Sequence, residues 1–177
     1  LTHIRLEALA RNQNRNRWFA TTAASRELAI RSLGPDINKL ERKGYSGDAI
    51  TRVVLDLVGG VCASVFNTPL DMLIEIFLHR EIPALRHAQF VSLYRLATEA
   101  LVATTHAEVR KLTPPKVLRA STALNGAAAL FLDDFAHGAT DFWTHYKQLD
   151  GATASPRLFQ LWKDRRDALQ PGEESDL

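Results

Sequence analysis

Apolar residues recur every three to four positions along most of this 177-residue chain. That spacing is typical of amphipathic helices, whereas half-buried strands alternate apolar and polar residues. We find no segment that combines the strand period with flanking turn residues, and no internal repeat. The pattern therefore predicts an all-α protein, an irregular multi-helix bundle rather than a coiled coil.

Capping and breaking residues divide this pattern into separate helices. Thr21 or Thr22 can cap one helix, and Ser46 or Asp48 can cap another, because their side chains accept hydrogen bonds from free backbone N–H groups. Proline and glycine mark further boundaries. The expected helices are 1–11, 21–33, 35–43, 46–66, 69–82, 88–105, 115–138, 141–146 and 156–169. We assign residues 1–170 to a single domain and residues 171–177 to a disordered acidic tail.

The most apolar segment runs from Val53 to Phe66. This segment of 14 residues is interrupted by Asp56 and is shorter than the roughly 20 residues of a membrane span, and we expect Asn67-Thr68-Pro69 to end its helix. The segment is therefore interpreted as a buried helix, with Gly59 and Gly60 allowing a neighbouring helix to approach closely. No membrane span is predicted.

Composition excludes several classes of protein. Hydrophobic residues make up 46% and charged residues 24%, which is typical of a globular domain. The formal net charge is only +2 with basic residues spread along the chain, so we expect no nucleic-acid partner. Cys62 is the single cysteine, which precludes an internal disulfide and favours a reducing, cytoplasmic location.

Three side chains that can bind metals lie four residues apart: Asp71, Glu75 and His79. On a helix this spacing places them along one face. The rest of that helix is largely apolar, so its acidic face is either solvated or buried with a partner. A buried Glu75 needs a metal, a cation or hydrogen-bond donors, because burying an unpaired carboxylate is costly.

A second set of acidic residues and histidines is Asp133, Asp134, His137, Asp141 and His145. Pairs three and four residues apart can chelate a metal from one helix face, as in carboxylate-bridged bundles. The Glu-x-x-His pairs of those bundles are missing from the sequence. Polar groups at the end of a helix explain the same residues without a metal.

The first residues, Leu1-Thr2-His3-Ile4, begin without Met and without a capping residue, and we expect the chain to be truncated here. In a His-Glu-x-x-His motif two histidines one helical turn apart bind zinc, and the glutamate activates water. Leu-Thr-His is a suitable ending for that motif. If His-Glu preceded Leu1, His3 would be the second histidine.

Together with NRNRWFATTAASRELAIRSL (14–33) and FNTPLDMLIEIFLHREIPALRHAQFVSLY (66–94), this start resembles the part of a bacterial His-Glu-x-x-His zinc metallopeptidase, gluzincin-like, that follows the motif. The resemblance covers His3 to about Tyr146. It implies a zinc-dependent hydrolase acting on a peptide or protein substrate, with His3 as a zinc ligand. The general base would lie ahead of Leu1, so these 177 residues are expected to be inactive alone.

The resemblance also implies a third zinc ligand. The short spacings used in related families fall on Leu9, Thr22 and Ala23, which cannot bind zinc in that role. The candidates on helices are Glu27 and Glu75, and we prefer Glu75 because its helix is nearly all apolar.

Asp71, one turn before Glu75, would then orient a zinc ligand from outside the coordination sphere. Two other interpretations remain open. One is a non-catalytic helical interaction or scaffold domain, and the other is a different metal-binding helical bundle.

Overall fold

The computed structural model describes residues 8, 11–12, 14 and 22–168. Their helices are α2 (Ala23–Ser32), α3 (Gly34–Glu41), α4 (Gly47–Glu81), α5 (Arg86–Thr105), α6 (Ala107–Leu112), α7 (Pro115–Phe135), α8 (Phe142–Tyr146) and α9 (Ser155–Ala168), with 3₁₀ turns at Pro83–Leu85 and Ala152–Ala154. The described part of the chain contains no strand, and the predicted all-α bundle is confirmed. The helix expected over 1–11 and the tail over 171–177 lie outside what can be described.

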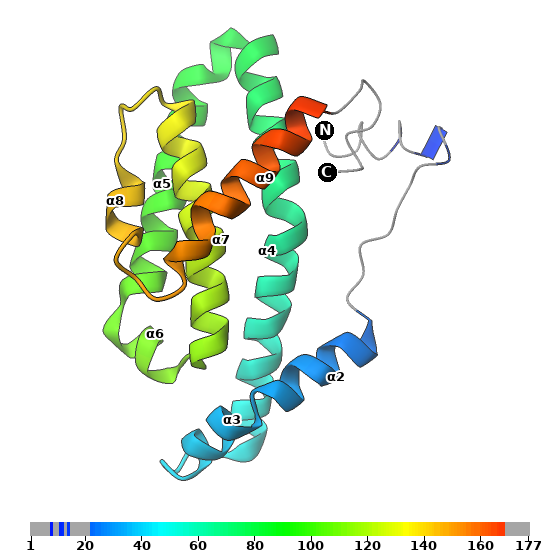
Figure 1. Cartoon of the computed structure of the whole chain (residues 1–177), viewed down its shortest axis with the longest axis vertical. Coiled ribbons are helices and arrows are strands. Elements are labelled where there is room, and N and C mark those ends of the chain that lie inside the picture. The colour runs from blue at the N-terminus through cyan, green and yellow to red at the C-terminus, as the bar shows by residue number, and fades with distance from the viewer. Residues whose placement is uncertain (1–7, 9–10, 13, 15–21, 169–177) are drawn as a thin grey trace.

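Helix α7 is the centre of the bundle. It packs against α4, α5, α8 and α9, and nine of its residues are buried. Figure 1 shows α4, α5 and α7 running side by side, with α9 crossing them obliquely and α2 and α3 lying at the start of α4. Helices α4 and α7 run in the same direction, and α5 runs in the opposite one.

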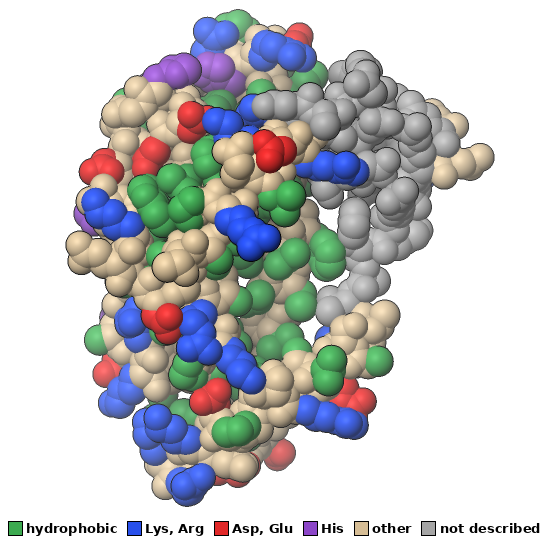
Figure 2. All heavy atoms as spheres, viewed as in Figure 1, with side chains coloured by type: hydrophobic (Ala, Val, Ile, Leu, Met, Phe, Trp, Pro, Cys, Tyr) green, Lys and Arg blue, Asp and Glu red, His purple; other side chains and the backbone are tan. Residues whose placement is uncertain are grey.

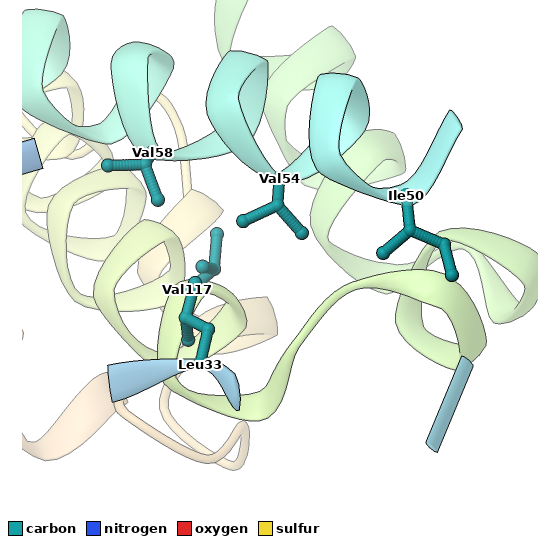
Figure 3. Packing of buried hydrophobic residues seen from close by; sticks show 5 residues of the cluster. All are labelled: Leu33, Ile50, Val54, Val58 and Val117. Carbon is teal, nitrogen blue, oxygen red and sulfur yellow. The ribbon is translucent and has the colours of Figure 1, made fainter. Parts of the chain in front are cut away.

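Buried side chains form two clusters at opposite ends of α7. The first joins Leu33 to three residues of α4 and to the start of α7, and Figure 3 shows its members Leu33, Ile50, Val54, Val58 and Val117. The second joins α7 to α8 and contains Ala129, Leu132, Phe142 and Tyr146. The candidate site lies beside the second cluster, because Ala129, Leu132 and Tyr146 also line its cavity.

Local capping follows the sequence closely. The Thr22 hydroxyl accepts a hydrogen bond from the Ser25 backbone N–H at 3.1 Å, and α2 begins at the next residue. Ser46 caps α4 in the same way, through the Ala49 N–H at 3.2 Å. These predicted helix starts are confirmed, because capping depends only on residues three positions apart.

The predicted break at Pro69 is wrong. Helix α4 continues through it for 35 residues, although proline removes one backbone hydrogen bond in a helix interior. Buried residues lie on both sides of the proline, Val58 before it and Met72 and Ile74 after it. Pro69 and Met72 also line a small cavity of about 20 Å³ together with Phe159 and Trp162 of α9.

The expected burial around Gly59 and Gly60 is also wrong. Both glycines are exposed, and no neighbouring atom lies within 4 Å of the position that a Cβ would occupy. Only one face of the first half of α4 reaches the core, and apolar side chains such as Val53 (51% exposed) and Val65 (47%) remain exposed. Figure 2 shows hydrophobic side chains on the surface along the part of the molecule where α4 lies.

Because α4 is continuous, the argument from length against a membrane span does not hold. Among the described residues α4 is the one helix long and apolar enough to cross a membrane, by length and composition alone. A core helix of a globular protein passes the same test. In this structure α4 contacts α2, α3, α5 and α7.

Candidate functional site

Glu75 lies in the second half of α4, on the side that faces α5. Its side chain is half-buried and accepts a hydrogen bond from Gln89 of α5, with Nε2 to Oε2 at 2.5 Å. The same Gln89 nitrogen donates to the Glu75 backbone oxygen at 2.7 Å. Gln89 is itself buried, so the carboxylate is held in place by an amide that packing immobilises. This confirms the expectation that the Glu75 helix reaches the core.

The Glu75 side chain lines a cavity of about 440 Å³ between α4, α5 and α7. The cavity is bounded on α4 by Thr68, Asp71, Met72 and Glu75, on α5 by Leu93, Leu96, Ala97 and Ala100, on α7 by Asn125, Ala128, Ala129, Phe131 and Leu132, and on α8 by Tyr146. Its volume falls within the range of about 300–1,000 Å³ that is common for small-molecule sites. Asp71 and Leu96 are exposed, so the cavity opens to solvent on their side.

Tyr146 is one of the residues that line this cavity, and it is only 1% exposed. Its hydroxyl makes no hydrogen bond of ordinary geometry with the described residues. Burial raises the pKa of the Tyr146 phenol to about 12, and the neighbouring Thr104 hydroxyl offsets part of that effect. Thr104 is in turn fixed by Asn125, whose Nδ2 donates to Thr104 Oγ1 at 3.0 Å.

His79 follows Glu75 by one helical turn, as the sequence predicted. Its ring packs edge-on against Phe135 of α7, with centroids 4.9 Å apart. Its Nδ1 is buried and has no hydrogen-bond partner among the described residues. Asp71, one turn before Glu75, lies at the exposed side of the cavity.

His3, the other expected zinc ligand, lies outside the described residues, so its position relative to Glu75 stays a prediction. Within the described part of the chain, no group of three or more His, Cys, Asp or Glu side chains gathers in a way that could hold a metal ion. Of the two expected ligands, only Glu75 is among the residues that the structure describes.

The alternative glutamate ligand, Glu27, lies on the surface. Its side chain is 63% exposed and forms an ion pair with Arg31 one turn along α2. The solvated position inferred from the sequence is confirmed, and Glu27 lies on a different helix from every residue of the cavity.

The second acidic set serves the structure of the chain instead of gathering at a common point. Asp133 accepts hydrogen bonds from the backbone N–H groups of Phe142 (3.0 Å) and Trp143 (2.9 Å) and from the Thr140 hydroxyl (2.7 Å). It therefore caps α8 from a position at the end of α7. Asp134, its neighbour, is exposed and lies 3.7 Å from the Lys163 ammonium group.

The polar residues Gln89, Asn125 and Tyr146 were not identified from the sequence. Gln89 and Asn125 interrupt otherwise apolar helical faces, which was the available signal. Their partners lie 14 and 21 residues away, so the signal could not reveal what they contact.

No protein-family model, curated protein or solved structure matches this chain.

Proposed function

We propose that this chain is part of a zinc-dependent metallopeptidase in which Glu75 and His3 are metal ligands. The observation that carries the proposal is the position of Glu75: a carboxylate on the wall of a 440 Å³ cavity, oriented by the buried amide of Gln89. Carboxylates that bind catalytic zinc are commonly held in this way by hydrogen bonds from neighbouring side chains.

The donor set of the described residues fits one part of such a site. Glu75 supplies a carboxylate oxygen, Gln89 fixes its orientation, and Asp71 is placed one turn away at the cavity mouth. The proposal further requires His3 to approach Glu75, and a His-Glu pair before Leu1 to complete the motif. Bound zinc would supply polarisation of the scissile carbonyl and of the attacking water.

The cavity supplies what a peptidase needs beside its metal. Its apolar walls exclude water from a bound side chain, and its opening at Asp71 and Leu96 gives access from solvent. The acidic residues at that side favour a cation over an anion, which suits a metal ion. Peptide-bond hydrolysis with the glutamate upstream of Leu1 as general base is the resulting function.

The test uses the protein extended by its natural upstream sequence, which must read His-Glu directly before Leu1. The extended protein is expected to bind one zinc ion per chain, measured by elemental analysis after dialysis, and to cleave peptides. Glu75→Gln should remove the zinc, and Gln89→Leu should weaken it about 10- to 100-fold, as is typical when a ligand loses its orienting partner.

Glu27→Gln is the matched control, because it changes an exposed glutamate of the same chain. It should leave both zinc content and cleavage unchanged. An upstream sequence other than His-Glu, or full zinc content in Glu75→Gln, would refute the proposal. Zinc-dependent peptidase activity from the 177 residues alone would also contradict it.

A second candidate is a non-catalytic interaction domain. It is favoured by exposed apolar side chains on α5, where Val91 (52% exposed) and Val102 (55%) lie three turns apart on one face. Under this alternative the extended protein binds no zinc. Val91→Asp together with Val102→Asp would then abolish its self-association or partner binding without unfolding it.

A further inference from the structure

A second hollow, which we call the basic cleft, lies between α3 and the segment where α6 leads into α7. Its volume is about 100 Å³, and it shares no lining residue with the cavity beside Glu75. Lys and Arg side chains are visible in Figure 2 at the end of the molecule where Figure 1 shows α3. The charged side chains of its lining come from α3, from the turn after α3 and from α6: Asp36, Lys39, Lys43, Arg110 and Lys111.

Positive charge is concentrated in the basic cleft. Its lining has four cationic side chains and one carboxylate, a formal charge of +3, whereas the whole chain carries only +2. A concave surface lined by one sign of charge attracts ions of the opposite sign and raises their local concentration. The basic cleft therefore favours an anion.

The cations of the basic cleft are not neutralised by carboxylates of the described residues. Lys39, Lys43 and Arg110 form no ion pair there, although Asp36 lines the same cleft. Lys111 makes only a 3.8 Å contact with a glutamate one turn earlier on α6. Arg110 is also half-buried, and a charged group that is partly removed from water is stabilised by a charged partner. Its guanidinium N–H groups are thus available to an anion from solution.

Volume and charge together point to a phosphate group. The basic cleft is smaller than the cavity of roughly 150 Å³ that takes up benzene in an engineered protein, so a group without a ring fits inside it. A phosphate monoester carries a charge of about −1.5 to −2 at neutral pH, whereas a carboxylate or a phosphodiester carries one negative charge. Arginine and lysine are the usual partners of phosphate. Helix α7 begins at Pro115 on the wall of the cleft, and its dipole adds positive potential.

We propose that the basic cleft binds the terminal phosphate of a phosphate monoester. The half-buried Arg110 holds the phosphate, and the exposed Lys39 and Lys43 contribute charge from α3 and the turn after it. The Thr113 hydroxyl lines the same cleft and can donate a further hydrogen bond. Such a phosphate occurs on soluble metabolites and on the headgroup of phosphatidic acid. The site requires no zinc and is independent of the proposed peptidase function.

The test is a calorimetric titration of the intact 177-residue chain with methyl phosphate and with dimethyl phosphate, in a buffer free of phosphate. Methyl phosphate is expected to bind once per chain and at least about tenfold more tightly, because it carries more negative charge. Arg110→Gln should weaken its binding at least about tenfold. Asp36→Asn should strengthen it about threefold or more by removing the carboxylate of the cleft, a gain that a poorly folded variant would not show.

Arg157→Gln is the matched control for Arg110→Gln. Arg157 is an exposed residue of α9 outside the basic cleft, and its replacement changes the net charge of the chain equally. It should leave the affinity for methyl phosphate unchanged. Equal weakening in the two arginine variants, equal affinities for the two probes, weaker binding in Asp36→Asn, or no saturable binding by the folded chain would each overturn the site.

A second measurement distinguishes the two sources of the phosphate. The chain is sedimented with phosphatidylcholine vesicles that contain or lack phosphatidic acid. Binding that requires phosphatidic acid and is displaced by methyl phosphate supports the site and assigns it to a lipid headgroup. Binding of methyl phosphate without sedimentation supports the site and assigns it to a soluble phosphate monoester. Vesicle binding that is unchanged in Arg110→Gln would contradict a lipid headgroup in the cleft.

Discussion

Replacing Asp133 with alanine is expected to destabilise the fold by about 3 kcal/mol. The carboxylate accepts two backbone hydrogen bonds at the start of α8, from Phe142 at 3.0 Å and Trp143 at 2.9 Å, and one from Thr140 at 2.7 Å. Hydrogen bonds to a charged group contribute about 1.5–3 kcal/mol each. Water can reach the half-buried Asp133, so the lower end of that range applies to the two backbone bonds.

The assay is urea unfolding at neutral pH, followed by circular dichroism and by tryptophan fluorescence. A lower midpoint with an unchanged slope would show that stability alone has changed. Asp133→Asn keeps one oxygen acceptor and should lose only about 1–2 kcal/mol, intermediate between wild type and Asp133→Ala.

Asp134→Ala is the matched control for Asp133→Ala. Asp134 is the next residue, is exposed, and makes only a long ion pair with Lys163, so its loss should change stability by no more than about 0.5 kcal/mol. The capping role of Asp133 is refuted if the two alanine variants unfold at the same urea concentration.

Three further variants test the packing of the helices and the ionisation of Tyr146. Gly126→Ala should lower the free energy of unfolding by about 1–3 kcal/mol, because its new methyl group would lie 3.1 Å from Ser155 Cβ and press α9 away from α7. An unchanged melting temperature would contradict this. Pro69→Ala should raise the free energy of unfolding, measured in urea, by up to about 3 kcal/mol, because the alanine N–H can donate a hydrogen bond to the Val65 carbonyl. A lower free energy of unfolding would show that the proline ring itself is needed for packing. Tyr146 keeps its proton in the folded state up to pH about 12 but loses it near pH 10 when unfolded, so stability should fall as the pH rises between these values, and Tyr146→Phe should lack that part of the fall.

Helix positions and starts could be predicted where the determining contacts are local. Thr22 and Ser46 cap their helices through residues three positions away, and both helix starts were identified. Pro69 is the exception, because α4 continues through it and is buried on both sides of it, at Val58 and at Met72 and Ile74. Local propensity is a weak guide when tertiary packing opposes it.

The candidate site likewise contains one residue that the sequence indicated and one that it did not. Glu75 could be selected from the sequence, because an acidic residue on a nearly apolar helix must meet a partner if the helix is buried. Its partner could not be selected: Gln89 comes from another helix, and its amide is one of many polar groups with suitable chemistry. The Asp133 set shows the opposite outcome, since spacing suitable for a metal serves as a helix cap.

The sequence by itself determined the all-α class, most helix boundaries and the apolar surroundings of Glu75, because these follow from the 3.6-residue period and from contacts within one turn. The tertiary structure decided that α4 is continuous, that Gly59 and Gly60 are exposed, and that Glu75 shares a cavity with Asn125 and Tyr146. Those features depend on which helix faces meet. Helix faces meet through side chains far apart in the chain, and their pairing is set by the packing of the whole bundle rather than by any single segment.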